Sequence, residues 1–138
     1  MKQTILFLAI ILYSLQASAK EPPEHYACYS ARWVDLSEKG KEVSYPWKDV
    51  DISIVFDYNN FKIIICSWDT LTLNVVHVGF HYETKEGENG MDIQTVDNKG
   101  LRGLCTYVKT MEKVEDRKER LIVTYKNARA EYKIRKVK

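Results

Sequence analysis

Strict alternation of apolar and polar residues is the feature that most limits the fold of this chain. Between residues 51 and 58 one face of an extended segment would be apolar and the other polar, since Ile52, Ile54 and Phe56 alternate with Asp51, Ser53 and Asp57. A period of two predicts a strand that is buried on one side. The Asp57–Asn60 segment is rich in residues that favour tight turns, and a second apolar run follows at 61–68. These segments predict a β-hairpin.

The same pattern continues through the rest of the chain. Further strands are predicted at 26–34, 71–83, 91–96, 101–109, 121–125 and 128–134, with turns at 97–100 and 126–127. In the first strand, Tyr29, Ala31 and Trp33 are expected on one face. Gly79 is expected to bend or bulge its strand. The charged segment 111–120 would be a mobile loop or a single helical turn, and the loop is favoured.

No segment has the length and helical period of a crossover helix, so a parallel α/β sheet is disfavoured. The sequence instead predicts an all-β fold, an antiparallel meander of eight or nine strands. Closing such a sheet into a small up-and-down barrel removes its exposed edges. A sandwich of two sheets is the alternative.

The first residues have the order of a secretory signal peptide. Lys2 precedes the apolar run Ile5–Leu12, and Ala17-Ser18-Ala19 offers small residues for cleavage. The apolar run is too short to span a membrane, so no transmembrane segment is expected after cleavage. Residues 1–19 are therefore predicted to be a signal peptide, 20–25 an extended leader and 26–138 one β domain. The mature protein is expected in the periplasm or outside the cell.

The charge of the chain excludes one class of partner. Its formal net charge is only +2, and both signs are interspersed along the sequence. Such a chain has no global attraction for a polyanion, so nucleic acid is not an expected partner.

Three cysteines, Cys28, Cys66 and Cys105, all fall in predicted strands. Export permits disulfides, but an odd number leaves at least one thiol unpaired within a monomer. One disulfide among them, with the pairing left open, and three buried free thiols are the two interpretations.

No local motif predicts catalysis, a metal or a cofactor. His77 and His81 have a spacing that suits a metal site on a helix, but in a strand they would stand about 13 Å apart. The Asp97–Gly100 segment lacks the alternating ligands of a calcium loop and is interpreted as a turn. Phosphate-binding loops, dinucleotide fingerprints and nucleophile elbows are missing from the sequence.

Three aromatic residues fall in or beside predicted loops: Tyr45, Trp47 and Trp68. Aromatic side chains at loops can form the mouth of a ligand cavity, or they can cap the end of a sheet. They are the candidate ligand-binding residues of the sequence.

The strand and turn patterns resemble a group of small, signal-peptide-bearing secreted proteins of Bacteroides-type bacteria. Four segments carry the resemblance: Asp51–Asp57, Phe61–Ser67, Val96–Cys105 and Leu121–Ile134. The resemblance covers the chain from Trp33 onward and implies a lipocalin-like small barrel or open meander. It brings no established activity, so it implies no functional residue.

The sequence thus favours an exported, non-enzymatic binding module that holds a small apolar ligand or an envelope protein at one end of a β-barrel. The first alternative is a structural or protein-interaction component with a filled core, which could dimerise through an edge strand or an unpaired cysteine. The second alternative is a hydrolase with its residues assembled from distant strands.

Overall fold

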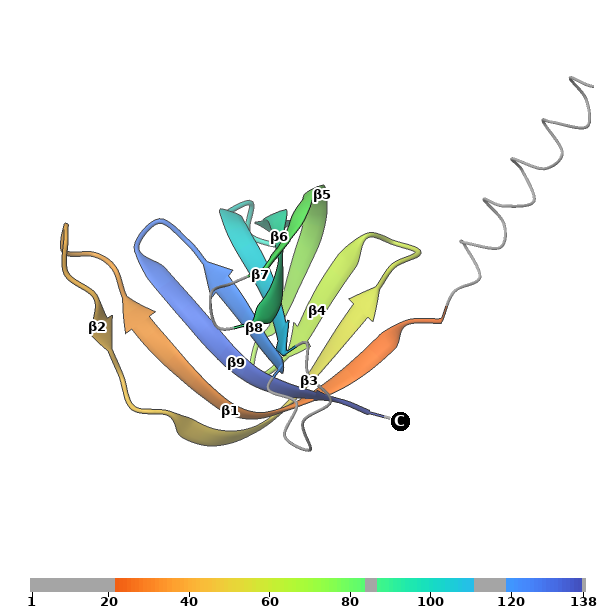
Figure 1. Cartoon of the computed structure of the whole chain (residues 1–138), viewed down its shortest axis with the longest axis horizontal. Helices are drawn as coiled ribbons and strands as arrows, with labels where there is room; N and C mark the ends of the chain where they lie inside the picture. The colour runs from red at the N-terminus through yellow and green to blue at the C-terminus, as the bar shows by residue number, and fades with distance from the viewer. Residues whose placement is uncertain (1–21, 84–86, 111–118, 138) are drawn as a thin grey trace, which may run out of the picture.

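The computed structural model describes residues 22–83, 87–110 and 119–137, and these residues form strands and turns without a helix (Figure 1). The nine strands are β1 (Glu24–Asp35), β2 (Val43–Ser44), β3 (Lys48–Asp57), β4 (Lys62–Cys66), β5 (Thr70–Glu83), β6 (Glu88–Asp97), β7 (Arg102–Thr110), β8 (Glu119–Thr124) and β9 (Ala128–Lys136). The prediction of an all-β chain with eight or nine strands is confirmed.

The strands form a closed antiparallel barrel. From β3 to β9 each strand pairs with the next one in sequence, and β1 pairs with both β3 and β9. Eight strands therefore close the barrel, and Figure 1 shows β1 and β9 lying side by side where it closes. The short strand β2 is an addition that pairs only with the end of β1. The predicted up-and-down barrel is confirmed, and the two-sheet sandwich is not what forms.

The hairpin of β3 and β4 follows the alternation of the sequence. Ile54 pairs with Ile65, and Phe56 pairs with Ile63. These four side chains are all buried, because cross-strand partners project from the same face of a sheet. In the turn between the strands, Asp57 accepts hydrogen bonds from the backbone N–H and the side-chain amide of Asn60.

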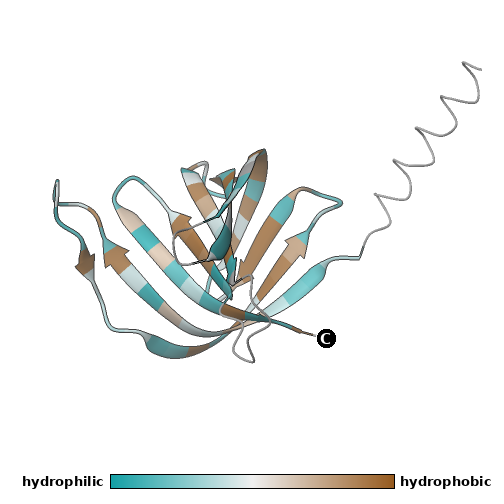
Figure 2. Ribbon diagram, viewed as in Figure 1, coloured by the Kyte–Doolittle hydropathy of each residue, from teal (hydrophilic) through white to brown (hydrophobic). Residues whose placement is uncertain are grey.

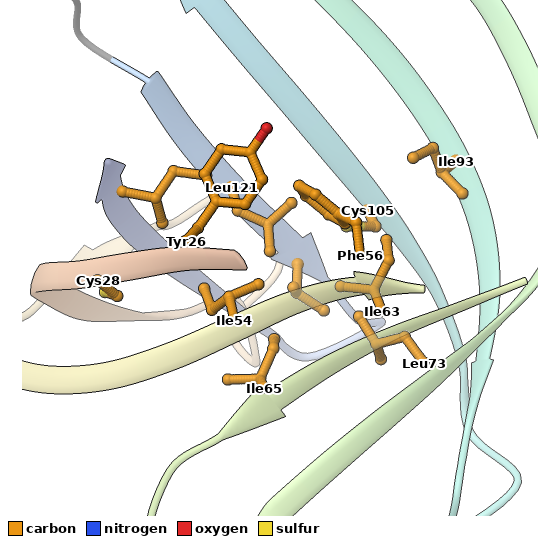
Figure 3. Close-up of a cluster of buried hydrophobic side chains, with 12 residues drawn as sticks. Tyr26, Cys28, Ile54, Phe56, Ile63, Ile65, Leu73, Ile93, Cys105 and Leu121 are labelled. Carbon is orange, nitrogen blue, oxygen red and sulfur yellow. The ribbon is translucent and has the colours of Figure 1, made fainter. Parts of the chain in front are cut away.

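The core fills one part of the barrel tightly. Figure 3 shows the side chains of this cluster projecting inward from several strands, and Figure 2 shows apolar and polar residues alternating along them. The most deeply buried side chains include Ile54, Ile65, Leu73, Cys105, Leu121 and Val123. Close packing of this kind stabilises the barrel independently of anything bound within it.

Strands β1 and β5 contain bulges. On β1, Cys28 pairs with Ile134 and Ser30 with Lys133, so the intervening Tyr29 is an extra residue that reverses the alternation. Tyr29 stacks with Arg135, whereas Ala31 packs against the core. The prediction that Tyr29 shares a face with Ala31 is therefore wrong. On β5 the register shifts twice between Val75 and His81, which confirms the irregularity predicted at Gly79.

The outer face of β1 and β9 carries an ion-pair network. Glu131 is only 3% exposed, and its carboxylate lies 2.9 Å from Arg32 Nε and 3.5 Å from Arg129 Nε. Arg129 also binds Glu42 through two hydrogen bonds. The network ties the segment between β1 and β3 to β9.

Two predictions fall on other parts of the chain. The signal peptide at 1–19 lies outside the described residues, and so do residues 111–118 of the loop predicted at 111–120. The last two residues of that predicted loop, Glu119 and Arg120, instead begin β8. Within the described part, no apolar helix of membrane-spanning length occurs.

Candidate ligand-binding cavity

An apolar cavity of about 390 Å³ lies inside the barrel, at the end where β3 turns into β4. Strands β1, β3, β4, β5, β6 and β7 each contribute side chains to its wall. The aliphatic part of the lining is Ile63, Val75, Val78, Met91 and Ile93. In Figure 3, Phe56 and Ile63 stand on one side of the interior and Ile93 stands on the opposite strand. Four of the lining residues, Tyr26, Phe56, Ile63 and Ile93, also belong to the buried core cluster.

Three aromatic rings form one wall of the cavity. The ring of Tyr107 is perpendicular to that of Phe56, with centroids 5.9 Å apart and planes at 89°. Tyr26 meets both rings, at centroid distances of 4.9 Å from Phe56 and 6.3 Å from Tyr107. Edge-to-face packing of this kind is favourable beyond the area that it buries. The wall is therefore apolar and held in one arrangement.

Phe61 stands at the rim of the cavity in an unusual backbone conformation. Its φ of 51° lies in the left-handed region, where a non-glycine residue is uncommon. The carbonyl of Phe61 accepts a hydrogen bond from Val75 N–H at 2.8 Å, which fixes the backbone there. The side chain is 69% exposed, so burial does not explain why an aromatic residue occupies this position.

The mouth of the cavity is polar. A second space adjoins it, lined by the charged residues Glu24, Lys109, Glu119, Arg135 and Lys136 and bordered by Tyr26, Tyr58 and Tyr107. The tyrosine rings thus contact the apolar cavity on one side and the charged mouth on the other. An arrangement of this kind suits a molecule that is apolar along its body and polar at one end.

Glu24 has its hydrogen-bonding capacity occupied within this mouth. Its Oε2 accepts hydrogen bonds from the hydroxyls of Tyr26 and Tyr58, both at 2.9 Å, and its Oε1 lies 3.4 Å from Lys136 Nζ. Burial alone would raise the pKa of Glu24, but the hydrogen bonds from Tyr58 and Tyr26 and the Lys136 ammonium lower it. Burial raises the pKa of Tyr26, so its hydroxyl stays a donor.

The aromatic residues singled out from the sequence lie elsewhere. Tyr45 lines an open depression together with Trp33 and Pro46. Trp47 lies on the outside of the barrel, where its ring centroid is 4.8 Å from Arg32 Cζ and 4.2 Å from Lys133 Nζ. Trp68 is fully exposed in the turn that follows β4, which is at the opposite end from the cavity. The structure does not bring the three together, and their role as ligand contacts stays a prediction.

All three cysteines are free thiols, and all lie among the described residues. Cys28 and Cys105 are buried, and Cys66 is exposed. A disulfide among them stays a prediction. His77 and His81 lie on either side of the irregularity in β5, and within the described ranges no group of three or more metal-ligating side chains occurs.

The sequence interpretation missed the residues that surround the cavity. The pattern predicts Phe56, Phe61 and Met91 only as strand residues, because a single sequence does not reveal which inward positions lack a packing partner. A signal was nevertheless present. Tyr58 and Phe61 are large aromatic residues within or just after a turn that contains two asparagines, where small polar residues are the rule.

The chain matches no protein-family model, no curated protein and no solved structure at a significant level of similarity. The resemblance to secreted Bacteroides-type proteins consequently stays a prediction. The function has to be argued from the site itself.

Proposed function

We propose that this chain is an exported binding module that holds a small apolar ligand in the cavity between Phe56, Val78 and Ile93. The observation that carries the proposal is the cavity of about 390 Å³ with an almost entirely apolar lining. Its size falls in the range of roughly 300–1,000 Å³ that is common for small-molecule sites. Barrels of eight strands often hold one small ligand in this way.

The interior favours this function over that of a purely structural component. A barrel that acts only through its surface would be expected to fill its interior with its own side chains. Here one part is filled by residues such as Ile65 and Leu121, while the other part holds the cavity. The sheet also closes on itself through β1 and β9, so a long free edge for strand pairing is missing among the described strands.

Export is supported by the order of residues 1–19, in which a basic residue precedes an apolar run and Ala17-Ser18-Ala19. It is tested by expressing the full chain in a Gram-negative bacterium and measuring the intact mass of the purified protein. The measured mass should be that of a chain that begins at Lys20, and the protein should be recovered in the periplasmic fraction. A full-length chain in the cytoplasm would contradict export without affecting the binding proposal.

Ligand binding is tested with the neutral fluorescent probe N-phenylnaphthylamine and two valine variants. Val78 lines the cavity but is 52% exposed, so Val78→Trp should fill the cavity without disturbing the core. Val76, which is 65% exposed, lines a different depression with Leu104 and provides the matched control Val76→Trp. The wild type and Val76→Trp should bind the probe equally, and Val78→Trp should lose at least about tenfold in affinity.

A third variant separates the cavity from the loop aromatics. The double substitution Trp47→Ala and Trp68→Ala leaves every wall of the cavity unchanged and should retain the affinity of the wild type. Loss of binding in this variant, together with normal binding in Val78→Trp, would move the site to the loops. No binding by the wild type would overturn the proposed function.

A further inference from the structure

Glu119 is a buried carboxylate at the first position of β8. It pairs across the sheet with Ile134, whose side chain is 1% exposed in the core. Because cross-strand partners project from the same face, the side chain of Glu119 also points into the barrel. It is 8% exposed and lines the mouth of the cavity.

One oxygen of this carboxylate is left without a partner. Glu119 Oε2 is buried and accepts no hydrogen bond from any residue that the structure describes. Buried polar groups are nearly always hydrogen-bonded, so an orphan acceptor calls for an explanation such as a ligand. Glu24, in the same mouth, provides the contrast, because both of its oxygens have partners.

Among the residues that the structure describes, the neighbours of Glu119 do not supply the missing donor. Lys109 lies opposite Glu119 on β7, but no ion pair joins the two. Lys136 lies against Glu24, and Arg135 stacks on Tyr29. Tyr107 borders the same mouth as Glu119, yet Oε2 accepts no hydrogen bond from it.

Tyr107 connects this acceptor to the apolar cavity. Its ring borders both spaces, as does that of Tyr26. A molecule whose apolar body lies beside Phe56 and Ile93 would therefore carry its polar end past the tyrosine rings toward Glu119. A head group with an N–H or O–H could donate to Oε2, whereas an ionised carboxylate head has only acceptors to offer.

We infer that the ligand is an amphiphile with a hydrogen-bond-donating head, an alcohol or an amine, which Glu119 Oε2 receives at the mouth of the apolar cavity. The inference rests on the proposed function and adds the chemical class of the ligand to it. It also explains why a carboxylate occupies the inward face of β8 beside core residues such as Leu121.

The test compares three compounds with the same alkyl chain: octanol, octylamine and octanoate. Each displaces N-phenylnaphthylamine from the wild type, from Glu119→Gln and from the control variant Glu42→Gln, whose carboxylate binds Arg129 away from the cavity. The wild type should bind octanol and octylamine at least about tenfold more tightly than octanoate, since octanoate leaves the buried acceptor unpaired. Glu119→Gln should abolish this preference, and Glu42→Gln should retain it.

The outcomes separate the inference from the proposal beneath it. A preference for octylamine alone would identify a cationic head, and a preference for both compounds would identify a donor of either kind. Equal binding of all three compounds, or an unchanged preference in folded Glu119→Gln, would overturn the inference while leaving the apolar cavity as a binding site. Circular dichroism of each variant verifies that it is folded. If the wild type does not bind the probe, the proposed function itself fails.

Discussion

The ring of Tyr26 stands edge-on to the ring of Phe56, with centroids 4.9 Å apart and planes inclined at 73°. This pair joins the start of β1 to the end of β3, because Tyr26 pairs with Ile54 and Glu24 with Phe56. The rings face the apolar cavity, and the hydroxyl of Tyr26 reaches Glu24 at its mouth. A single contact thus positions both the apolar wall and a polar group beside the entrance.

Replacing Phe61 with Asn should separate binding from stability. Phe61 is 69% exposed and has a φ of 51°, a conformation that Asn adopts more readily. Phe61→Asn should keep the free energy of unfolding or raise it by up to about 1 kcal/mol. The affinity for N-phenylnaphthylamine should fall severalfold, because the rim loses its aromatic side chain. Urea unfolding and probe titration measure the two effects.

Leu101→Asn is the matched control for this variant. Leu101 is 57% exposed just before β7, at the end of the barrel away from the cavity. Leu101→Asn should therefore leave the affinity for the probe unchanged. If Phe61→Asn bound the probe as tightly as the wild type, the rim would have no role in binding.

The alternation along β4 predicts unequal effects of two neighbouring isoleucines. Ile65 is fully buried against Leu71 and Ile54, whereas Ile64 is only partly buried on the other face. Ile65→Ala should lower the free energy of unfolding by about 2–5 kcal/mol, and Ile64→Ala by about 1 kcal/mol. Urea unfolding of both variants checks the difference. Equal losses would contradict the assigned faces of the strand.

The hydrogen bonds that Asp97 accepts predict that the free energy of unfolding falls in acid. Its Oδ1 accepts hydrogen bonds from the backbone N–H of Lys99 at 2.9 Å and of Leu101 at 2.8 Å, and its Oδ2 accepts one from the hydroxyl of Tyr125 at 3.1 Å. Burial opposes ionisation, but the hydrogen bonds from Leu101, Lys99 and Tyr125 outweigh it and lower the pKa below the ordinary value of 3.8. The charged form therefore stabilises the fold.

Because the pKa of folded Asp97 lies below that of the unfolded chain, its stabilisation is complete above about pH 4 and disappears as the pH falls through the folded value. Asp97→Asn should be about 1–3 kcal/mol less stable than the wild type at pH 7. The difference should shrink as the pH drops below 3.8. Urea unfolding from pH 7 to pH 2.5 measures it, and a constant difference would contradict the assignment.

The three thiols should react at very different rates. Burial raises the pKa of Cys105 to about 12, and burial likewise raises that of Cys28 to about 11, although hydrogen bonds with the backbone of Ser30 and Lys133 oppose the shift. Cys66 is exposed. Ellman's reagent at pH 8 should therefore titrate one thiol rapidly in the native protein and three in urea. A single reactive thiol in urea, instead of three, would show a disulfide. Two rapidly reacting thiols in the native protein would contradict the burial of Cys28 or Cys105.

Much of the fold could be predicted from the sequence because the barrel follows local rules. The Ile52, Ile54 and Phe56 alternation identifies the buried face of β3, and the asparagine-rich turn after Asp57 identifies the hairpin. The bulge at Tyr29 could not be predicted, since its neighbours offer no glycine or proline to mark it. The two-residue strand β2 is too short to leave a periodic signal.

The site was harder to predict than the fold. Tyr45, Trp47 and Trp68 are candidates because they fall near loops, but the ring of Trp47 is already in contact with Arg32 and Lys133. A cavity depends on which inward side chains fail to meet, and that is a property of strand tilt and register around the whole barrel. The orphan oxygen of Glu119 is equally invisible in the sequence, because it depends on every group around it.

Methyl NMR of the wild-type protein during titration with N-phenylnaphthylamine tests the central claim most directly. The methyl signals of Val75, Met91 and Ile93, which line the cavity, should shift and saturate at one probe per chain. The signals of Val76 and Leu104, which lie in a separate surface depression, should stay in place. Shifts at Val76 and Leu104 with none at Met91 and Ile93 would contradict a ligand-binding cavity inside the barrel.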